Sequence, residues 1–144
     1  MRFMLLMIPR GYENAAPDAV QTLDAERVAQ MMKFNEDLQK AGVLLALDGL
    51  HPPSMGARVS FKDGLASITD GPFAEAKEVV GGYWMIQVKS RDEALAWASR
   101  CPASDDEVIE VRQVQEFADF TPEVQQAAGG YADMLAQSAN AAKP

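Results

Sequence analysis

The chain has 144 residues, of which 48% are apolar and 24% are charged. These proportions are typical of one globular domain and exclude a disordered chain, a collagen-like repeat and a coiled coil. The formal net charge is −8, and because a nucleic-acid binder needs a basic surface, we expect no nucleic-acid partner. The longest apolar run, Phe3 to Ile8, is too short to cross a bilayer and lacks the flanks of a signal peptide. We therefore expect a cytoplasmic protein with no membrane partner.

The acidic charge is concentrated in one segment of the chain. Between Ser90 and Phe120 there are 8 acidic and 3 basic residues. One interpretation is a solvated acidic surface, because such charge chiefly favours solubility. The other interpretation is an acidic patch that meets a basic partner.

The residue types that usually hold metals are scarce. The sequence contains one cysteine, Cys101, and one histidine, His51. These counts exclude an internal disulfide, a cysteine-based zinc site and a multi-histidine metal site. The spacing of the carboxylates matches no calcium or magnesium loop. We therefore expect neither a metal nor a cofactor.

The first third of the chain predicts a strand, a helix and a strand. Phe3 to Ile8 is apolar at every position, as in a strand covered on both faces. A polar loop to about Gln21 follows, and then an apolar stripe predicts a helix from Asp24 to Ala41, ended by Gly42. Val43 to Leu47 reads as the second strand, which the sequence His51-Pro52-Pro53 breaks.

The middle of the chain predicts a hairpin, a strand, a helix and a last strand. Arg58 to Phe61 and Leu65 to Thr69 read as a short hairpin that turns at Lys62-Asp63-Gly64. Val79 to Lys89 alternates as a half-buried strand, and Ser90 to Arg100 reads as a helix that begins with a capping box. Glu107 to Phe117 reads as the last strand.

The C-terminal segment differs in composition from the rest. Thr121-Pro122 predicts the start of a helix that is rich in Ala and Gln, has few apolar anchors and is interrupted at Gly129-Gly130. We therefore expect residues 1–117 to form the folded domain. Residues 118–144 are expected to form an Ala-rich helical appendage.

The order of elements predicts an α+β fold of the ferredoxin-like βαββαβ type, with a short hairpin insertion. Both main helices then cover the same face of an antiparallel sheet. Because the first strand is apolar on both faces, the other face also needs cover. A second copy of the sheet, related by a two-fold axis, is the simplest cover, so we expect a homodimer.

The most distinctive stretch runs from Thr69 to Glu78 and ends in Gly81-Gly82. One interpretation is structural: the Asp70 carboxylate accepts hydrogen bonds from backbone amides in a tight turn, and Phe73 packs into the core. In the functional interpretation, three carboxylates surround a lysine and act as acid or base, or hold a polar ligand. These residues are Asp70, Glu75, Lys77 and Glu78.

This stretch closely resembles the pattern of the DGPF-domain proteins of the YCII-related family, Thr-Asp-Gly-Pro-Phe-x-Glu-x-Lys-Glu followed by Gly-Gly. The resemblance covers about residues 1–117 and implies a ferredoxin-like fold paired as a dimeric α+β barrel. Some shorter relatives carry a histidine on the first helix and an Asp-Pro step after the second. Here Asn35 is the nearest polar residue on the first helix, and Cys101-Pro102 replaces that step. The histidine–aspartate pair of those relatives is therefore not carried over.

Two further residues suggest a small polar site. His51 follows the second strand, and histidine exchanges a proton near neutral pH. It is either a surface or packing residue, or it forms an acid/base dyad with Asp70. Arg112 on the last strand either clamps an anionic ligand or pairs with Glu110 or Asp119. The candidate catalytic residues are His51 and Asp70, and the candidate ligand-binding residues are Glu75, Lys77, Glu78 and Arg112.

Two functions from different classes fit these residues. The first is a dimeric protein whose polar pocket binds or transforms a small polar or anionic molecule by acid/base chemistry. The second is a non-catalytic regulatory protein. The family resemblance suggests a role beside an extracytoplasmic-function sigma factor. Its partner would meet the acidic residues 105–119 and the tail from Thr121.

Overall fold

The structure is a computed structural model that describes residues 1–141. The chain forms two compact units, Met1–Gln113 and a second that begins at Val114. The predicted domain boundary, between residues 117 and 118, lies slightly further along the chain. None of the helices within the described residues is long and apolar enough to cross a membrane.

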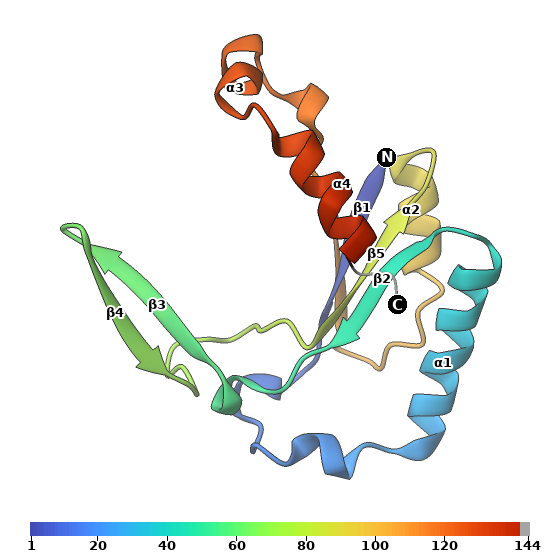
Figure 1. Cartoon of the computed structure of the whole chain (residues 1–144). Helices are drawn as coiled ribbons and strands as arrows, with labels where there is room; N and C mark the ends of the chain where they lie inside the picture. The colour runs from blue at the N-terminus through green and yellow to red at the C-terminus, as the bar shows by residue number, and fades with distance from the viewer. Residues whose placement is uncertain (142–144) are drawn as a thin grey trace. The chain divides into compact units, whose positions relative to one another are not determined.

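The first unit is built on a four-stranded antiparallel sheet (Figure 1). Its strands are β1 (Arg2–Ile8), β2 (Leu44–Gly49), β5 (Gly82–Gln87) and β6 (Val108–Gln113). Their order is β2-β5-β1-β6, and every neighbouring pair is antiparallel. This is the ferredoxin-like arrangement that the order of elements predicts.

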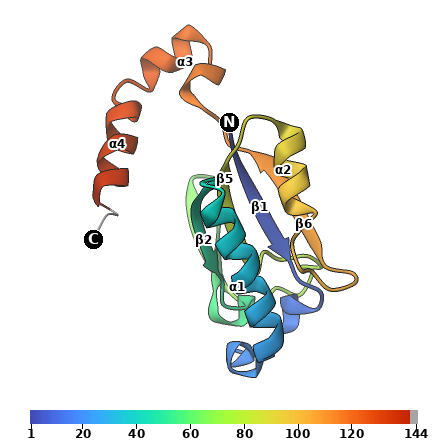
Figure 2. The same cartoon turned by 90° about the vertical axis from the view of Figure 1, so that its right-hand side faces the viewer.

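Two helices cover one face of this sheet, α1 (Ala25–Lys40) and α2 (Arg91–Ala98), as Figure 2 shows. Side chains cap the start of both helices, and the cap predicted at Ser90 is confirmed. The Asp24 carboxylate accepts the Glu26 amide at 3.1 Å, and the Ser90 hydroxyl accepts the Glu93 amide at 3.1 Å. The Glu93 carboxylate reaches one residue further back than expected and accepts the amide of Lys89 at 2.9 Å.

The core lies between the helices and the sheet. Alternate residues of β1 and β5 point into it, as the period of two predicts. The buried apolar side chains are Phe3, Leu5, Phe34, Leu38, Trp84, Ile86, Val88 and Ala94. The rings of Phe34 and Trp84 meet edge to face at 5.5 Å between centroids, which joins α1 to β5.

The other face of the sheet, called here the open sheet face, carries the remaining alternate side chains, and neither α1 nor α2 covers it. It is mostly apolar at its centre and polar at its edges. Tyr83 donates to the Asp48 carboxylate at 2.9 Å, which raises the pKa of the Tyr83 hydroxyl. The side chains of this face are Arg2, Met4, Leu6, Ile8, Ala46, Asp48, Tyr83, Met85, Gln87, Val108, Glu110 and Arg112.

The predicted hairpin is confirmed and forms its own two-stranded sheet, β3 (Ala57–Lys62) and β4 (Leu65–Asp70). Asp63 and Gly64 have φ of 51° and 76°, the left-handed pair that a two-residue hairpin turn requires. Every residue of both strands is exposed. Figures 1 and 2 show that the hairpin leaves the sheet on the side opposite α1 and α2.

The structure corrects the ends of two predicted strands and adds two 3₁₀ turns to the first loop. β5 and β6 are shorter than the predicted strands, residues 79–89 and 107–117. The last strand ends early because the Asp119 carboxylate accepts the Glu116 amide at 2.7 Å, which closes a 3₁₀ turn at Phe117–Asp119. The loop that was expected to be irregular up to residue 21 contains 3₁₀ turns at Tyr12–Asn14 and Ala19–Thr22.

The second unit contains the helices α3 (Pro122–Ala127) and α4 (Tyr131–Ala141). The Thr121 hydroxyl accepts the Val124 amide at 3.4 Å, with proline in the first turn as predicted. Gly130 has φ of +89° and separates the two helices, so the predicted interruption is confirmed.

Candidate functional site

The Asp-Gly-Pro-Phe turn, residues 70–73, contacts the segment of residues 53–56 that follows β2, at the base of the hairpin. Gly71 donates its amide to the Gly56 carbonyl at 2.9 Å and precedes a cis peptide bond to Pro72. A Cβ on Gly71 would lie 2.6 Å from the carbonyl carbon of Pro53 and closer still to its oxygen. Only glycine therefore permits this close approach of two backbone segments.

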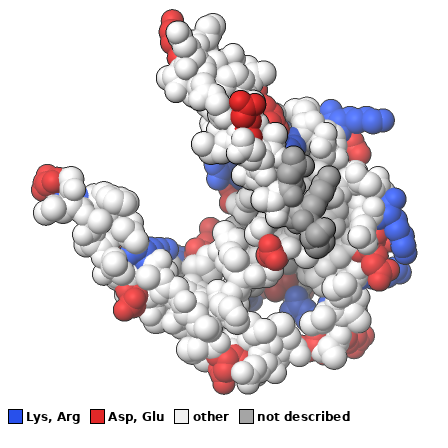
Figure 3. Space-filling model, viewed as in Figure 1, with Lys and Arg blue, Asp and Glu red and all other residues white. Residues whose placement is uncertain are grey.

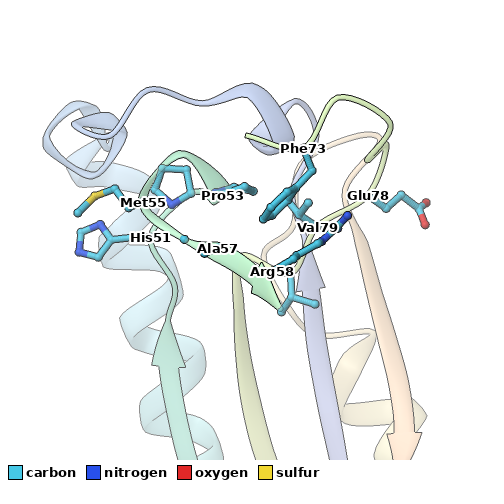
Figure 4. A pocket seen from close by; sticks show the side chains of 11 residues that line it. His51, Pro53, Met55, Ala57, Arg58, Phe73, Glu78 and Val79 are labelled. Atoms are coloured by element: carbon cyan, nitrogen blue, oxygen red, sulfur yellow. The ribbon is translucent and has the colours of Figure 1, made fainter. Parts of the chain in front are cut away.

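A first cavity of about 450 Å³ lies beside this turn (Figure 4). His51 and Arg58 occupy different sides of it, and Glu78 directs its carboxylate away from Phe73. The Arg58 guanidinium lies 3.9 Å from the centre of the Phe73 ring, a cation–π contact that orients the arginine. The lining residues are His51, Pro52, Pro53, Met55, Gly56, Ala57, Arg58, Phe73, Glu78, Val79 and Val80.

A second, larger cavity of about 660 Å³ lies at the same end of the sheet. Its wall comes from the loop of residues 9–23, the first half of α1 and residues 49–51 after β2, with Gly81 and Glu107. Most of the wall is apolar. The apolar lining residues include Met7, Val20, Leu23, Val28, Met31 and Leu50. His51 lines both cavities, so this residue lies between them.

The polar groups in the wall of the larger cavity are held by hydrogen bonds. Arg27 pairs with Glu107 at 2.9 Å, and the same carboxylate accepts the Ser104 amide at 2.7 Å. The side chain of Glu107 is only 11% exposed. The Tyr12 hydroxyl donates to the Leu50 carbonyl at 2.6 Å, and burial raises the pKa of Tyr12. These contacts give the cavity a fixed polar edge.

His51 differs from these groups because its imidazole makes no hydrogen bond or ion pair with any other part of residues 1–141. The side chain is exposed at the mouth of both cavities. Its two ring nitrogens are therefore available to a bound molecule as donor, acceptor or proton carrier.

The structure brings together only two of the predicted site residues, since His51 and Glu78 line the smaller cavity. Asp70 ends β4 opposite Ala57 and lines neither cavity. Glu75 and Lys77 are exposed and also lie outside both linings.

Arg112 lies apart from these residues on the open sheet face. It pairs with Glu110 at 3.6 Å, which is the structural alternative for this side chain. β6 is the third strand from β2, a separation of about 14 Å at the usual strand spacing. Arg112 is therefore distant from the strand that leads to His51.

The carboxylates that share the larger cavity with His51 are Asp24 and Glu107. No local pattern pointed to them. Asp24 has the sequence signature of a helix cap, and Glu107 lies in an acidic run, so only the sheet order reveals that both face one cavity. Glu107 also helps burial to raise the pKa of Cys101 to about 11, which keeps this thiol neutral and unreactive. Within residues 1–141, no group of His, Cys, Asp and Glu side chains is arranged to hold a metal ion.

Comparison with known proteins identifies the family. The family model of the YCII-related domain matches residues 1–118. The chain belongs to the YCII-related domain family. It is also similar to an uncharacterized protein of Rhizobium meliloti (strain 1021), with 39% identity over 59 residues. These residues are 41% of this chain and 48% of the relative, so the match spans about half the length of that protein.

In this YCII-related protein, Asn35 on the first helix is committed to a structural contact. Its side-chain oxygen accepts the indole N–H of Trp84 at 2.7 Å. Cys101, before Pro102, is a half-buried thiol with a raised pKa. Neither residue supplies acid/base chemistry, which leaves His51 as the candidate for that role.

Proposed function

We propose that this YCII-related protein binds a small organic molecule at the two cavities that share His51. The apolar part of the molecule occupies the larger cavity, and its polar or anionic group lies at the imidazole. The single observation that carries this proposal is the unpaired His51 side chain at the common mouth of both cavities.

The size and composition of the larger cavity support a small-molecule ligand. Ligand sites are usually about 300–1,000 Å³, mostly apolar, with a few fixed polar groups. The cavity of about 660 Å³ has that character, with Arg27, Glu107 and Tyr12 fixed along one edge. The apolar side chains around them favour a ligand with a hydrocarbon body.

The smaller cavity supports an anionic group on that ligand. Arg58 lines this cavity, and its guanidinium lies against the ring of Phe73. This guanidinium makes no ion pair within residues 1–141. A guanidinium held against an aromatic ring binds carboxylate or phosphate oxygens without first breaking a salt bridge. His51 lines the other side of the same cavity and supplies a second donor there.

His51 is also the group that would transfer a proton if the bound molecule reacts. Imidazole serves as general acid or base when it lies within hydrogen-bond distance of the reacting atom. Asp70, the predicted partner of His51, lines neither cavity, so we assign the proton transfer to His51 alone. Binding without reaction uses the same contacts.

The proposed assembly is a homodimer in which two open sheet faces meet as an α+β barrel. The half-buried apolar side chains at the centre of the open sheet face, Met4, Leu6 and Met85, support this pairing because a second sheet would complete their burial. Sedimentation of the full chain at micromolar concentration tests it. The mass of two chains is expected, and the mass of one chain contradicts the pairing.

A thermal-shift screen of small carboxylates and phosphate esters with apolar bodies tests ligand binding. Hits are expected to stabilise the wild type and to lose most of that stabilisation in His51→Gln and Arg58→Gln. Lys77→Gln is the matched control, since this exposed cation lies outside both cavities. Equal stabilisation of His51→Gln and wild type by every hit would place the ligand elsewhere.

The second candidate function is regulatory binding to another protein. α4 supports it, because Tyr131, Met134 and Leu135 form an exposed apolar stripe on one side of that helix. Two of the acidic residues proposed to meet the partner are already paired, Asp106 with Arg10 and Glu107 with Arg27. Co-purification with a sigma factor, lost in Met134→Ser/Leu135→Ser, is the expected result for this function.

A further inference from the structure

The β3–β4 hairpin has one mainly apolar and one mainly polar face, although Leu65 lies opposite Lys62 on the polar face and Asp70 lies opposite Ala57 on the apolar face. Residues directly opposite each other in an antiparallel pair point to the same face. Val59 faces Ile68 and Phe61 faces Ala66, whereas Ser60 faces Ser67 and shares a 2.7 Å hydrogen bond with it. We call the face that carries Val59, Phe61, Ala66 and Ile68 the apolar hairpin face.

The first unit does not cover the apolar hairpin face. Phe61 is 77% exposed, Ile68 is 74% exposed and Val59 is 54% exposed. A two-stranded ribbon with no packing partner is marginally stable in water. Side chains of this size at adjacent positions therefore indicate that another surface packs against the hairpin.

From these observations we infer that each hairpin is an arm that packs its apolar face on a second copy of this chain. The inference rests on the homodimer proposed above and adds a second contact to it. The hairpin projects on the same side of the sheet as the open sheet face. A two-fold partner that meets the open sheet face therefore also comes within reach of the hairpin.

The charge of the hairpin allows a copy of the same chain to pack at this surface. The chain as a whole carries a net charge of −8, which opposes association of two copies. The hairpin is locally neutral, since Arg58 and Lys62 balance Asp63 and Asp70. Figure 3 shows that the hairpin surface visible there is mostly uncharged. Two copies thus meet through surfaces that do not repel each other.

The combined size of the hairpin face and the open sheet face is compatible with the same partner. A stable interface uses about 20–30 residues on each side. The hairpin has two strands of 6 residues, and the open sheet face adds one side of four strands. Because only one face of the hairpin and one face of the sheet would pack on the partner, the two surfaces together approach the lower end of that range, while either alone falls well short of it.

Sedimentation equilibrium on the full chain tests the arm with a matched pair of variants. Phe61→Ser/Ile68→Ser is expected to raise the dissociation constant of the dimer by about tenfold or more. Each of the two chains loses two apolar side chains from the interface. Lys62→Ser/Thr69→Ser changes the polar face and is expected to keep the dissociation constant within about twofold. An unchanged dissociation constant in Phe61→Ser/Ile68→Ser would contradict the packing of the hairpin on the partner but not the pairing of the open sheet faces. A wild type that sediments as one chain overturns both.

Hydrogen exchange of the wild type gives a second test that needs no substitution. The hairpin amides are expected to be protected at concentrations where the chain is dimeric and to exchange faster on dilution. Protection that does not change with concentration means that the hairpin is covered within its own chain. Fast exchange at every concentration means that nothing covers it. Either result overturns the arm.

Discussion

The indole N–H of Trp84 donates a 2.7 Å hydrogen bond to the side-chain oxygen of Asn35. Trp84 is buried in the centre of β5, and Asn35 lies on α1 beside Phe34, which meets the same indole edge to face. The bond satisfies a donor that has lost contact with water and fixes the position of α1 on the sheet. Because the first half of α1 forms one wall of the larger cavity, this bond also fixes the site.

Asn35→Ala is expected to lower the free energy of unfolding by about 1–3 kcal/mol, because it leaves the indole N–H without a partner. Urea unfolding followed by tryptophan fluorescence measures the change. Gln39→Ala on the exposed side of the same helix is the control and is expected to change stability by less than about 0.5 kcal/mol. Equal effects of the two substitutions would mean that the bond contributes nothing.

Gly71→Ala is expected to destabilise the protein by about 1–3 kcal/mol, because the new methyl group overlaps the carbonyl of Pro53. The displacement also moves the wall of the smaller cavity, so ligand binding is expected to weaken. Gly56→Ala is the matched control, since the nearest atom to its Cβ is the Pro53 oxygen at 3.6 Å. That variant is expected to stay within about 1 kcal/mol of the wild type. A Gly71→Ala protein as stable as Gly56→Ala would contradict the close backbone contact.

The stability of the protein is expected to fall at alkaline pH through Cys101. Folding raises the pKa of this thiol from 9.0 to about 11, so the native state holds a proton that the unfolded state releases. The stabilising contribution is complete below about pH 9 and is lost as the pH rises to about 11. Because this thiol is only half-buried, screening by water reduces the contribution to about 1–2 kcal/mol. Cys101→Ala is expected to lack this loss, and parallel pH profiles of the two proteins would contradict the shift.

Glu107→Gln is expected to lower the pKa of Cys101, because the carboxylate is the second cause of its increase, after burial. The rate of alkylation of the thiol as a function of pH measures the change. Glu110→Gln, on the open sheet face, is the control and is expected to leave the profile unchanged. Glu107→Gln also removes the charge that pairs with Arg27 at the cavity wall, so its stability is expected to fall as well.

Much of the fold could be predicted because its determinants are local. Alternation in Tyr83–Val88 assigns the buried face of β5, and Asp24 and Ser90 mark the helix starts. The Asp63-Gly64 turn identifies the hairpin. The strand ends could not be predicted, because the 3₁₀ turn at Phe117–Asp119 depends on a side-chain bond within a sequence that also alternates like a strand.

The site was harder to predict because distant segments build it. The position of His51 after a strand suggested a rim, but its neighbours in the larger cavity, Asp24 and Glu107, meet it only through the order of the sheet. Local spacing instead favoured Asp70, which belongs to the turn that carries the hairpin. Val20 and Leu23 looked like parts of a loop, although they form part of the apolar wall.

The most direct test of ligand binding at His51 is a nuclear magnetic resonance titration of its imidazole. His51 is the only histidine in the chain, so one set of ring signals reports on the mouth of both cavities. A ligand from the thermal-shift screen is expected to shift these signals in step with its stabilisation of the protein, and to do the same in the Lys77→Gln control. Saturating binding that leaves the imidazole signals in place would contradict the proposed site.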